Sequence, residues 1–433
     1  MSRLLPLADT VAPSEFLPRT WRPRAVQDST WQSAEWQPDE LGRLMLQLSG
    51  AGQSALTSVS TEDLLAAWHS TVSACLDAGS ADEALFRCAL ARTSRLSPEG
   101  LAAGLDAVLR GLLRPHADRL ATALERTPST GAPGPSVILL ASNLPGLAAQ
   151  PLLRALLERR PVLLKSASDE PLFAPRFVAE LIRRLPALSA AVAATTWRGG
   201  DRRLEDVVFA QAGQVIAYGT EATLGDLAPR LRGRLLAHGP RASLAVIAAD
   251  ADLEAAAQGV AADVALFDQR GCLSVQAVYV LGALKGAALK GARRFATLLV
   301  SALSEASTRL PAGPATAAEL AGVQLLRAEA EIRGLPLEPS DSVIGTVVLE
   351  ERPLFLPSPG RRTVRVHNLD DPAELLSLLS PWKGRLQGVA TSGTIGESMR
   401  QALTDLRVTR IAPAGELQRP DATWENRGEA SRN

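Results

Sequence analysis

SVILLAS (136–142), GLAAQPLLRALLERR (146–160) and PVLLKSAS (161–168) place a short apolar run, an amphipathic stretch and a second apolar run in direct succession. Short apolar runs of this kind are typical of strands that are covered on both faces, and the stretch between them has helical spacing. The alternation recurs in APRFVAELIRRLP then AAVAATTW, LEDVVFAQA then QVIAYGT, and TLGDLAPRLRGRL then ASLAVIAA. We therefore predict an α/β protein with a doubly wound parallel sheet, which would bind ligands at the carboxyl ends of its strands.

Changes in composition divide the chain into four predicted segments. Residues 1–130 combine an irregular lead-in, rich in Pro and Trp, with amphipathic helices from Thr61 onward. Residues 131–248 hold the doubly wound domain. Residues 249–405 resume with a helix, the loop DQRGCLS and an apolar strand, which predicts a second α/β domain, and residues 406–433 form a C-terminal segment that becomes polar toward its end. Further strands are expected at TVVLEE (346–351), RRTVRVHNL (361–369), GVATSG (388–393) and VTRIAP (408–413).

The composition excludes several classes of protein. Across 433 residues, 46 basic side chains balance 46 acidic ones, so nothing indicates a nucleic-acid partner or an anionic membrane surface. The three cysteines form no CxxC and the four histidines lie far apart, which gives no support for a disulfide framework or a metal site. Cys75 and Cys88 are expected to be packing thiols on apolar helix faces. No stretch approaches the roughly 18 consecutive apolar residues of a membrane span, and we expect a cytoplasmic protein.

Three residues, Cys272, Asn143 and Lys165, lie in a loop or at the ends of predicted strands, where catalytic or ligand-binding side chains are expected. Cys272 lies in the polar, glycine-containing loop FDQRGCLS before an apolar strand, the kind of setting in which a thiolate can reach a substrate. Asn143 follows SVILLAS, where its side-chain amide could serve an oxyanion hole or bond its own backbone in an Asn-Leu-Pro turn. Lys165, one of few lysines, ends PVLLK and could meet a ribose or phosphate, or be a solvated cation. The residues alone leave these alternatives open.

The order of these features resembles the acyl-CoA reductase branch of the aldehyde dehydrogenase superfamily, the LuxC-type fatty-acyl reductases. The matching stretches are ASNLPG, LLERRPVLLKSASDEP, WRGGD, VIAYGTEATL, HGPRASLAVI, FDQRGCLSVQ, LPSPGRRTVRV and VTRIAPAGELQRP, over roughly 140–420. The resemblance implies an aldehyde dehydrogenase-like fold. In that fold, residues 131–248 would be a Rossmann-type dinucleotide-binding domain, and residues 249–405 would be the catalytic domain.

The resemblance also assigns roles to individual residues. Cys272 would be the nucleophile that becomes acylated, and Asn143 would donate to the oxyanion together with the Cys272 backbone N–H. Lys165 would contact the adenosine ribose or its 2′-phosphate. Ser168 stands where members that prefer NAD tend to carry a glutamate, and a neutral hydroxyl does not repel a phosphate. The expected cofactor is therefore NADPH.

Further positions follow from the same resemblance. Gly219 and Thr220 match the loop that accompanies the pyrophosphate, with Thr220 as the expected N-cap of a helix, and Glu351 matches the glutamate that holds the nicotinamide ribose. Hydrolytic aldehyde dehydrogenases carry a glutamate base where this chain has Ala237-His238. A reductase that releases aldehyde does not need that carboxylate, and His238 could act as proton donor or thiol base, or be an ordinary loop histidine.

The implied activity is NADPH-dependent reduction of an acyl-CoA, or of an acyl carrier protein thioester, to the aldehyde through an acyl-cysteine. The same residues could support a CoA-acylating aldehyde dehydrogenase or an acyl-phosphate reductase. They could also belong to an acyl-binding subunit that has lost turnover. A homo-oligomer or an acyl-transferring partner subunit is the expected assembly, with no nucleic acid and no metal.

Overall fold

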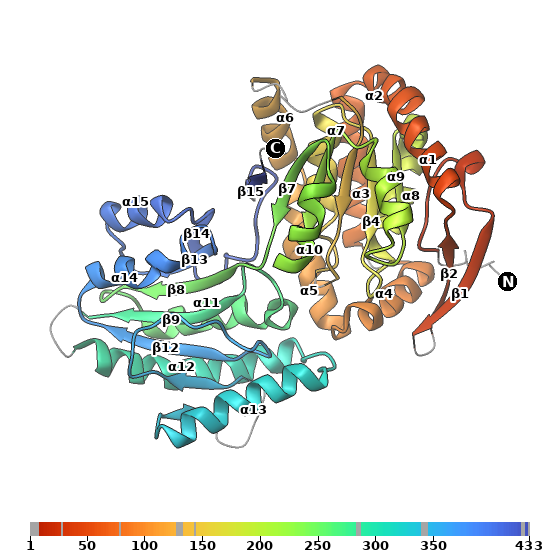
Figure 1. Ribbon diagram of the computed structural model, residues 1–433. Coiled ribbons are helices and arrows are strands. Elements are labelled where there is room, and N and C mark those ends of the chain that lie inside the picture. The colour runs from red at the N-terminus through yellow and green to blue at the C-terminus, as the bar shows by residue number, and fades with distance from the viewer. Residues whose placement is uncertain are drawn as a thin grey trace. The chain divides into compact units, whose positions relative to one another are not determined.

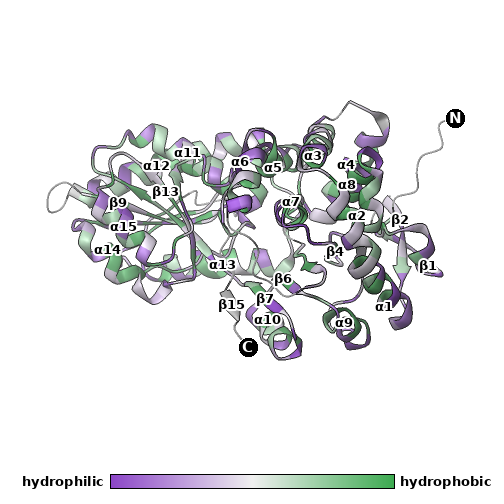
Figure 2. Ribbon diagram, turned by 90° about the horizontal axis from the view of Figure 1, so that it is seen from above, coloured by the Kyte–Doolittle hydropathy of each residue, from purple (hydrophilic) through white to green (hydrophobic). Residues whose placement is uncertain are grey.

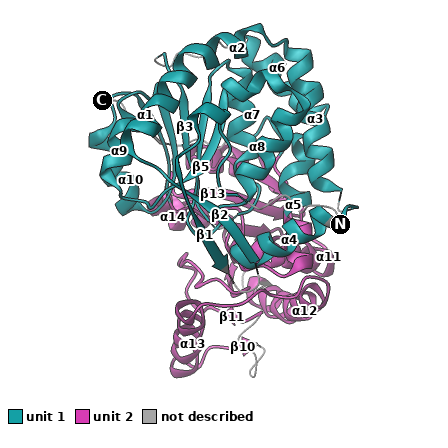
Figure 3. Ribbon diagram, turned by 90° about the vertical axis from the view of Figure 1, so that its right-hand side faces the viewer, with its two compact units in different colours: residues 1–94, 105–239, 421–433 teal, residues 95–104, 240–420 magenta. Residues whose placement is uncertain are grey.

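The structure is a computed structural model that describes residues 8–26, 29–77, 79–126, 133–142, 144–282, 287–338, 345–425 and 429–431. The chain forms two compact units, which are coloured separately in Figure 3. Unit 1 holds residues 1–94, 105–239 and 421–433, and unit 2 holds residues 95–104 and 240–420. Each unit is described by itself.

Unit 1 is built on the predicted doubly wound sheet. Its strands run in the order β15-β7-β6-β3-β4-β5, and all neighbours are parallel except β15 with β7. Because β3 pairs with both β4 and β6, the order reverses beside β3, which is the switch point at which Rossmann-type sheets bind dinucleotides. The strands are β3 (Ser136–Leu139), β4 (Val162–Ser166), β5 (Val192–Thr196), β6 (Gln214–Tyr218), β7 (Arg234–His238) and β15 (Glu429–Ser431). Their connections include α7 (Ala149–Leu157), α8 (Phe173–Arg184), α9 (Arg202–Phe209) and α10 (Glu221–Leu227).

The expected helix over TLGDLAPRLRGRL is only partly present. Helix α10 ends at Leu227, and a short 3-10 helix over Ala228–Arg230 follows, with Pro229 as its second residue. The apolar RLLAH that follows becomes β7 and pairs with β6. Proline stops the α-helix early because it cannot continue the hydrogen-bond ladder.

The described part of the lead-in, residues 8–26 and 29–40, contains regular strands where we expected irregular chain. Strands β1 (Thr20–Val26) and β2 (Ser29–Glu35) form an antiparallel hairpin, and Val11 bridges to Ala194 of β5. Trp36 donates its Nε1 hydrogen to Thr195 Oγ1 over 2.6 Å, so the lead-in is part of the unit 1 core. The helices that follow are α1 (Pro38–Gln47), α2 (Gln53–Ser58), α3 (Thr61–Leu76), α4 (Ala81–Ser94), α5 (Pro98–Leu109) and α6 (His116–Arg126). The buried thiol predicted on α4 is wrong, because Cys88 is exposed, whereas Cys75 on α3 is half-buried.

Unit 2 contains a seven-stranded sheet in the order β10-β11-β12-β9-β8-β13-β14, parallel except at β10. The predicted boundary at residue 248 is wrong, because β8 pairs with β9 and β13 of this sheet and the units divide after Gly239. The strands are β8 (Ala242–Ile247), β9 (Val275–Leu281), β10 (Leu337–Glu338), β11 (Val347–Leu349), β12 (Val364–Leu369), β13 (Leu386–Ser392) and β14 (Arg410–Pro413).

Helices cover both faces of this sheet. Figures 1 and 2 show α11 (Leu253–Ala265) and α12 (Ala287–Arg309) on one face, and α14 (Pro372–Leu379) and α15 (Glu397–Asp405) on the other. Every residue of β8 is buried, which explains why its sequence is continuously apolar instead of alternating. Helix α13 (Ala317–Ile332) completes the unit. Among the described residues, no helix is both long and apolar enough to cross a membrane.

Candidate active site

Cys272 lies in a tight turn between α11 and β9, as the loop context predicted. The Ser274 N–H donates to the Gly271 carbonyl over 3.0 Å, and the Gly271 N–H donates to Ser274 Oγ over 3.1 Å. Ser243 of β8 donates its hydroxyl hydrogen to the Cys272 carbonyl over 2.7 Å. The turn is therefore closed by its own end residues and fixed to the neighbouring strand.

The three residues before Arg270 adopt an unusual backbone. Phe267, Asp268 and Gln269 have φ angles of 56°, 52° and 64°. Left-handed conformation costs roughly 1–2 kcal/mol for each residue that is not glycine, so three in succession must be held by their surroundings. Phe267 packs so closely on Gly104 of α5 that a Cβ at residue 104 would lie 2.4 Å from its ring.

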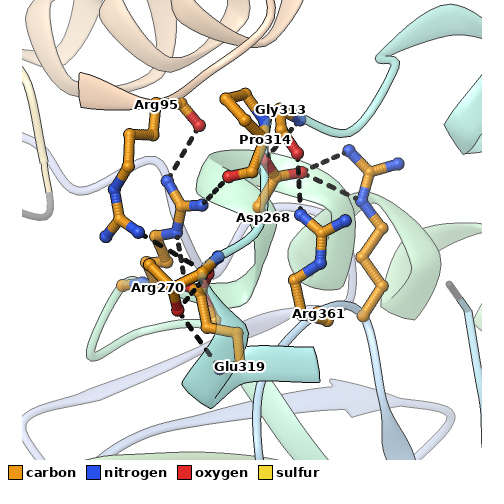
Figure 4. A network of polar contacts seen from close by, with 11 residues as sticks. Arg95, Asp268, Arg270, Gly313, Pro314, Glu319 and Arg361 are labelled. Carbon is orange, nitrogen blue, oxygen red and sulfur yellow. Dashed lines mark hydrogen bonds and ion pairs between the residues drawn. The ribbon is translucent and has the colours of Figure 1, made fainter. Parts of the chain in front are cut away.

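Buried polar contacts hold this left-handed segment, as Figure 4 shows. The Asp268 carboxylate accepts hydrogen bonds from Arg362 Nη2 at 2.7 Å, from Arg362 Nε at 3.2 Å and from the Gly313 N–H at 2.9 Å. Arg361 donates to the Gly313 carbonyl over 2.8 Å. Because both ions of the Asp268–Arg362 pair are nearly inaccessible to water, each requires the other.

Gln269 and Arg270 add further anchors. Gln269 Nε2 donates to the carbonyls of Val275 and Thr363 at 2.8 and 2.7 Å, and its Oε1 accepts the Thr363 N–H at 2.8 Å. Arg270 reaches Glu319 at 3.1 Å and the Arg95 carbonyl at 2.9 Å (Figure 4). The segment before the cysteine is thus tied to β9, to the residue before β12 and to α13.

The electrostatic surroundings of the sulfur keep it protonated at rest. Burial raises the pKa of the Cys272 thiol to about 11. The positive charge of Arg241 opposes this rise, as do the backbone N–H groups of Cys272 and Leu273. Arg241 stands directly before β8, and its Nη1 donates to Gln387 Oε1 over 3.1 Å. Our sequence reasoning missed Arg241, although its place in HGPRASLAVI before a strand was visible.

In unit 1, Lys165 occupies the carboxyl-terminal part of β4. It is half-buried, with its Nζ 5.9 Å from the centre of the Trp197 ring. Burial lowers the pKa of Lys165, and Glu205 acts in the opposite direction. The alternative of a solvated cation at the end of a strand does not describe this side chain.

The residues that follow β4 differ in their exposure to solvent. Ser168 and Asp169 are exposed. Glu170 is buried, its pKa is raised by that burial, and its Oε1 accepts the N–H groups of Leu172 and Phe173 at 2.9 Å each. Glu170 therefore contributes to the start of α8 and is removed from the surface at which Ser168 stands.

The loop after β6 has the predicted cap. Thr220 Oγ1 accepts the Thr223 N–H over 3.2 Å as the N-cap of α10. The Gly219 N–H donates to the His238 carbonyl over 3.2 Å. His238 ends β7 and stacks on Tyr218 with ring centres 4.4 Å apart. Lys165, Ser168, Gly219, Thr220 and His238 thus all lie at the carboxyl edge of one sheet, whereas Asn143 lies outside the described residues.

Glu351 and Cys272 lie at opposite edges of the unit 2 sheet. It is exposed and follows β11, whereas Cys272 precedes β9. In the parallel register, Leu349 is level with Val366 and Val366 with Val278. At about 3.3 Å per residue, Glu351 lies on the order of 15 Å along the strands from the beginning of β9. The structure therefore does not bring Glu351 to the cysteine, contrary to what a nicotinamide-ribose ligand would require.

Ser358 reaches the edge where Cys272 lies. Its N–H donates to Gln276 Oε1 over 3.1 Å, and its hydroxyl donates to the Thr363 carbonyl over 2.7 Å. The stretch LPSPGRRTVRV carried this signal in the sequence, since it leads directly into β12. Glu350, the neighbour of Glu351, is buried and pairs with Arg365 and Arg333.

Comparison with solved structures defines the class of fold. An oxidoreductase from Marinobacter aquaeolei superimposes with a TM-score of 0.72 at 14% identity, covering 100% of this chain and 98% of that one. An NADP-dependent glyceraldehyde-3-phosphate dehydrogenase from Bacillus halodurans gives 0.72 at 13% identity, covering 94% and 90%. An NAD-dependent benzaldehyde dehydrogenase from Corynebacterium glutamicum gives 0.71 at 15% identity, covering 97% and 95%. The chain has the aldehyde dehydrogenase fold.

The sequence comparison narrows this class to a family. Residues 83–429 match the family described as acyl-CoA reductase (LuxC), and the chain belongs to that family. It is 29% identical over 263 residues to a long-chain acyl-protein thioester reductase of Aliivibrio fischeri, covering 59% of this chain and 53% of that protein. A protein of the same description from Photorhabdus luminescens is 26% identical, covering 56% and 50%. The chain thus spans about half the length of these relatives.

Proposed function

We propose that this chain reduces a long-chain acyl thioester to the aldehyde, with NADPH as the reductant and Cys272 as the acyl carrier. The observation that carries the proposal is the turn that contains Cys272. Its thiol lies near the backbone N–H groups of Cys272 and Leu273 and is influenced by the charge of Arg241, and a left-handed segment over residues 267–269 precedes it. Membership in the acyl-CoA reductase (LuxC) family supports the same reading.

The edge of the unit 1 sheet fits a dinucleotide. Lys165, half-buried beside Trp197, would meet the adenosine ribose, and Gly219 and Thr220 would lie along the pyrophosphate beside the switch point of the sheet. The exposed hydroxyl of Ser168 and the inward position of Glu170 favour a 2′-phosphate, whereas the exposed carboxylate of Asp169 acts against one. On this basis we propose NADPH over NADH.

Acyl transfer begins with removal of the thiol proton. A pKa of about 11 means that the Cys272 thiolate is scarce near neutral pH, so a base must take the proton or the attack must be concerted with its loss. We propose His238 as that base, and Arg241 as the cation that stabilises the thiolate. Asn143 and the Cys272 N–H would hold the oxyanion.

The proposed reaction then has two covalent steps, acyl transfer to Cys272 and reduction of the acyl-cysteine. The Cys272 sulfur forms a bond to the thioester carbonyl carbon, and the bond from that carbon to the leaving sulfur breaks, so that the carrier thiol departs with the proton. Cys272 would hold the acyl group while NADPH, when bound, supplies hydride to the carbonyl carbon. The bond from that carbon to the Cys272 sulfur would then break from the resulting alkoxide, so that the aldehyde leaves and the thiolate is regenerated. Ala237 and His238 occupy the place of a hydrolytic glutamate, so no carboxylate there activates water against the acyl-enzyme.

NADPH oxidation across a ladder of acyl-CoA lengths tests the proposal, with NADH, acyl carrier protein thioesters and acyl phosphates as parallel arms. We expect Cys272→Ala to abolish oxidation and to remove the acyl adduct seen by intact mass. Cys88→Ala, at an exposed thiol on α4, is the matched control and should retain both. Near wild-type NADPH consumption by Cys272→Ala would overturn the proposal. An adduct without NADPH oxidation in the wild type would instead indicate an acyl-binding subunit.

The relatives' description as acyl-protein thioester reductases favours a protein-bound acyl group as the natural substrate. We propose an acyl carrier protein or an acyl-transferring partner subunit as its source. Pairing of copies of this chain and a cytoplasmic setting also stay predictions.

A further inference from the structure

A buried carboxylate holds the chain segment that follows β14. Asp263, near the end of α11, accepts the N–H groups of Gly415 at 2.7 Å, Leu417 at 3.1 Å and Gln418 at 3.4 Å. Both Asp263 and Gln418 are buried, at 1% and 4% exposure. Residues 414–418 are therefore fixed against α11 shortly before the chain returns to unit 1 at Asp421.

The side chain of Gln418 connects this segment to the cysteine turn. Its Nε2 donates to the carbonyls of Asp263 and, at 3.3 Å, Leu266, which follows the last residue of α11. Its Oε1 accepts the Ser274 hydroxyl hydrogen at 3.3 Å. One amide thus bridges the end of α11 and the last residue of the turn that contains Cys272.

The Ser274 hydroxyl can donate only one hydrogen bond, and the direction of that bond determines whether the same oxygen can accept one within the turn. Because that hydrogen points to Gln418, a lone pair of the same oxygen is available to the Gly271 N–H, which donates to it over 3.1 Å. Gly271 and Ser274 are the two ends of the turn. Gln418 therefore orients the hydroxyl group that closes the turn around the sulfur.

We propose that Gln418 is a positioning residue for Cys272, acting through the Ser274 hydroxyl to fix the turn that presents the sulfur. The inference rests on the proposed function in taking Cys272 as the nucleophile. Gln418 does not touch the sulfur in the described contacts, so its effect on reactivity must pass through Ser274. Small displacements of a nucleophile lower rates strongly, because the reacting atoms must approach along one geometry.

The test is a double-substitution cycle in the full chain, with Gln418→Ala, Ser274→Ala and the two combined. The first readout is the rate of Cys272 alkylation by iodoacetamide at fixed pH, followed on the tryptic peptide 271–285, which contains no other cysteine. The second is kcat for NADPH-dependent reduction of acyl-CoA. We expect each single variant to lose roughly tenfold or more in both, and the combined variant to lose no more than either one.

The controls separate positioning from general stability. Gln401→Ala removes an exposed amide that bonds Asp405 at 3.0 Å in the same unit, and should leave both readouts unchanged. The dissociation constant for NADPH should stay within twofold in every variant, since its proposed ligands are in unit 1. If Gln418→Ala does not fold, Gln418→Met takes its place in the cycle, because methionine keeps the length of the side chain and removes the oxygen that accepts the Ser274 hydrogen.

Losses that multiply in the combined variant would overturn the inference, since Gln418 would then act independently of Ser274. Wild-type alkylation and kcat in Ser274→Ala would overturn it as well. Alkylation requires no acyl substrate, so a wild-type protein that reduces no thioester would refute the proposed function while the alkylation cycle still tests the positioning role.

Discussion

Replacing Asp263 with asparagine should change how the stability of the protein depends on pH. The Asp263 carboxyl is 1% exposed, and burial raises its pKa from 3.8 to about 7. The N–H groups of Gly415, Leu417 and Gln418 oppose that rise, and the nearby charge of Glu416 adds to it. Asparagine has a similar shape and does not titrate, so the variant isolates the contribution of this proton.

The sign follows from where the proton is bound. Between about pH 4 and pH 7 the folded chain keeps a proton on Asp263 that the unfolded chain has released, so the free energy of unfolding falls as pH rises through this window. One pH unit corresponds to about 1.4 kcal/mol, which gives roughly 4 kcal/mol over the window as an upper value. Below about pH 4 and above about pH 7 the group contributes no further change.

Urea denaturation of both proteins at pH 4, 5, 6, 7 and 8 measures this. The free energy of unfolding of Asp263→Asn minus that of the wild type should increase by up to roughly 4 kcal/mol from pH 4 to pH 7 and then level off. Asp405→Asn, on the exposed face of α15, is the matched substitution. Parallel pH curves for wild type and Asp263→Asn would refute the reasoning, because they would mean that the carboxyl titrates alike in the folded and unfolded chains.

Three other substitutions test the support of the cysteine. Asp268→Asn should lower the free energy of unfolding by about 3–5 kcal/mol in urea denaturation, because Arg362, 1% exposed, would lose its buried counter-charge; a loss below about 1 kcal/mol would contradict this. Gly104→Ala should lower the melting temperature, because the added Cβ would lie 2.4 Å from the Phe267 ring. Such overpacking costs about 1–3 kcal/mol, which outweighs the gain of about 1 kcal/mol in helix propensity. A higher melting temperature would contradict this prediction. Arg241→Met should move the pH profile of Cys272 alkylation to higher pH, because the cation that opposes the rise in the thiol pKa is removed; an unchanged profile would show that this charge does not act on the sulfur.

The sequence predicted the strands of the two sheets well where both faces are covered. SVILLAS, PVLLKSAS and VQAVYVLG are mainly apolar because most residues on both faces of those strands are buried, and each became a strand. The hairpin over residues 20–35 was missed because its exposed and buried positions do not form a clean apolar run. Strand β7 was missed because RLLAH follows a helical stretch without a break in apolar spacing.

In the candidate site, too, local features could be predicted from the sequence, whereas features that depend on distant residues could not. The loop position of Cys272, the N-cap at Thr220 and the strand-end position of Lys165 could be predicted, because each depends on residues within one short stretch. The placement of Glu351 could not, since it depends on which end of β11 lies level with which end of β9. Arg362 and Gln418 bond residues of the cysteine segment from 94 and 144 residues away in the chain, and the charge of Arg241 acts on the thiol from the position before β8.

By itself, the order of apolar and polar residues determined the class of fold, the family and the loop on which the thiol stands, because local spacing sets secondary structure and the motif lies within a few residues. Only the tertiary structure decided that the thiol pKa is raised, that a left-handed segment precedes the thiol, and that a glutamine from the C-terminal segment bonds the serine that closes its turn. Burial and pairing between distant side chains set these properties, since the free energy of a charge or a strained backbone depends on everything packed around it.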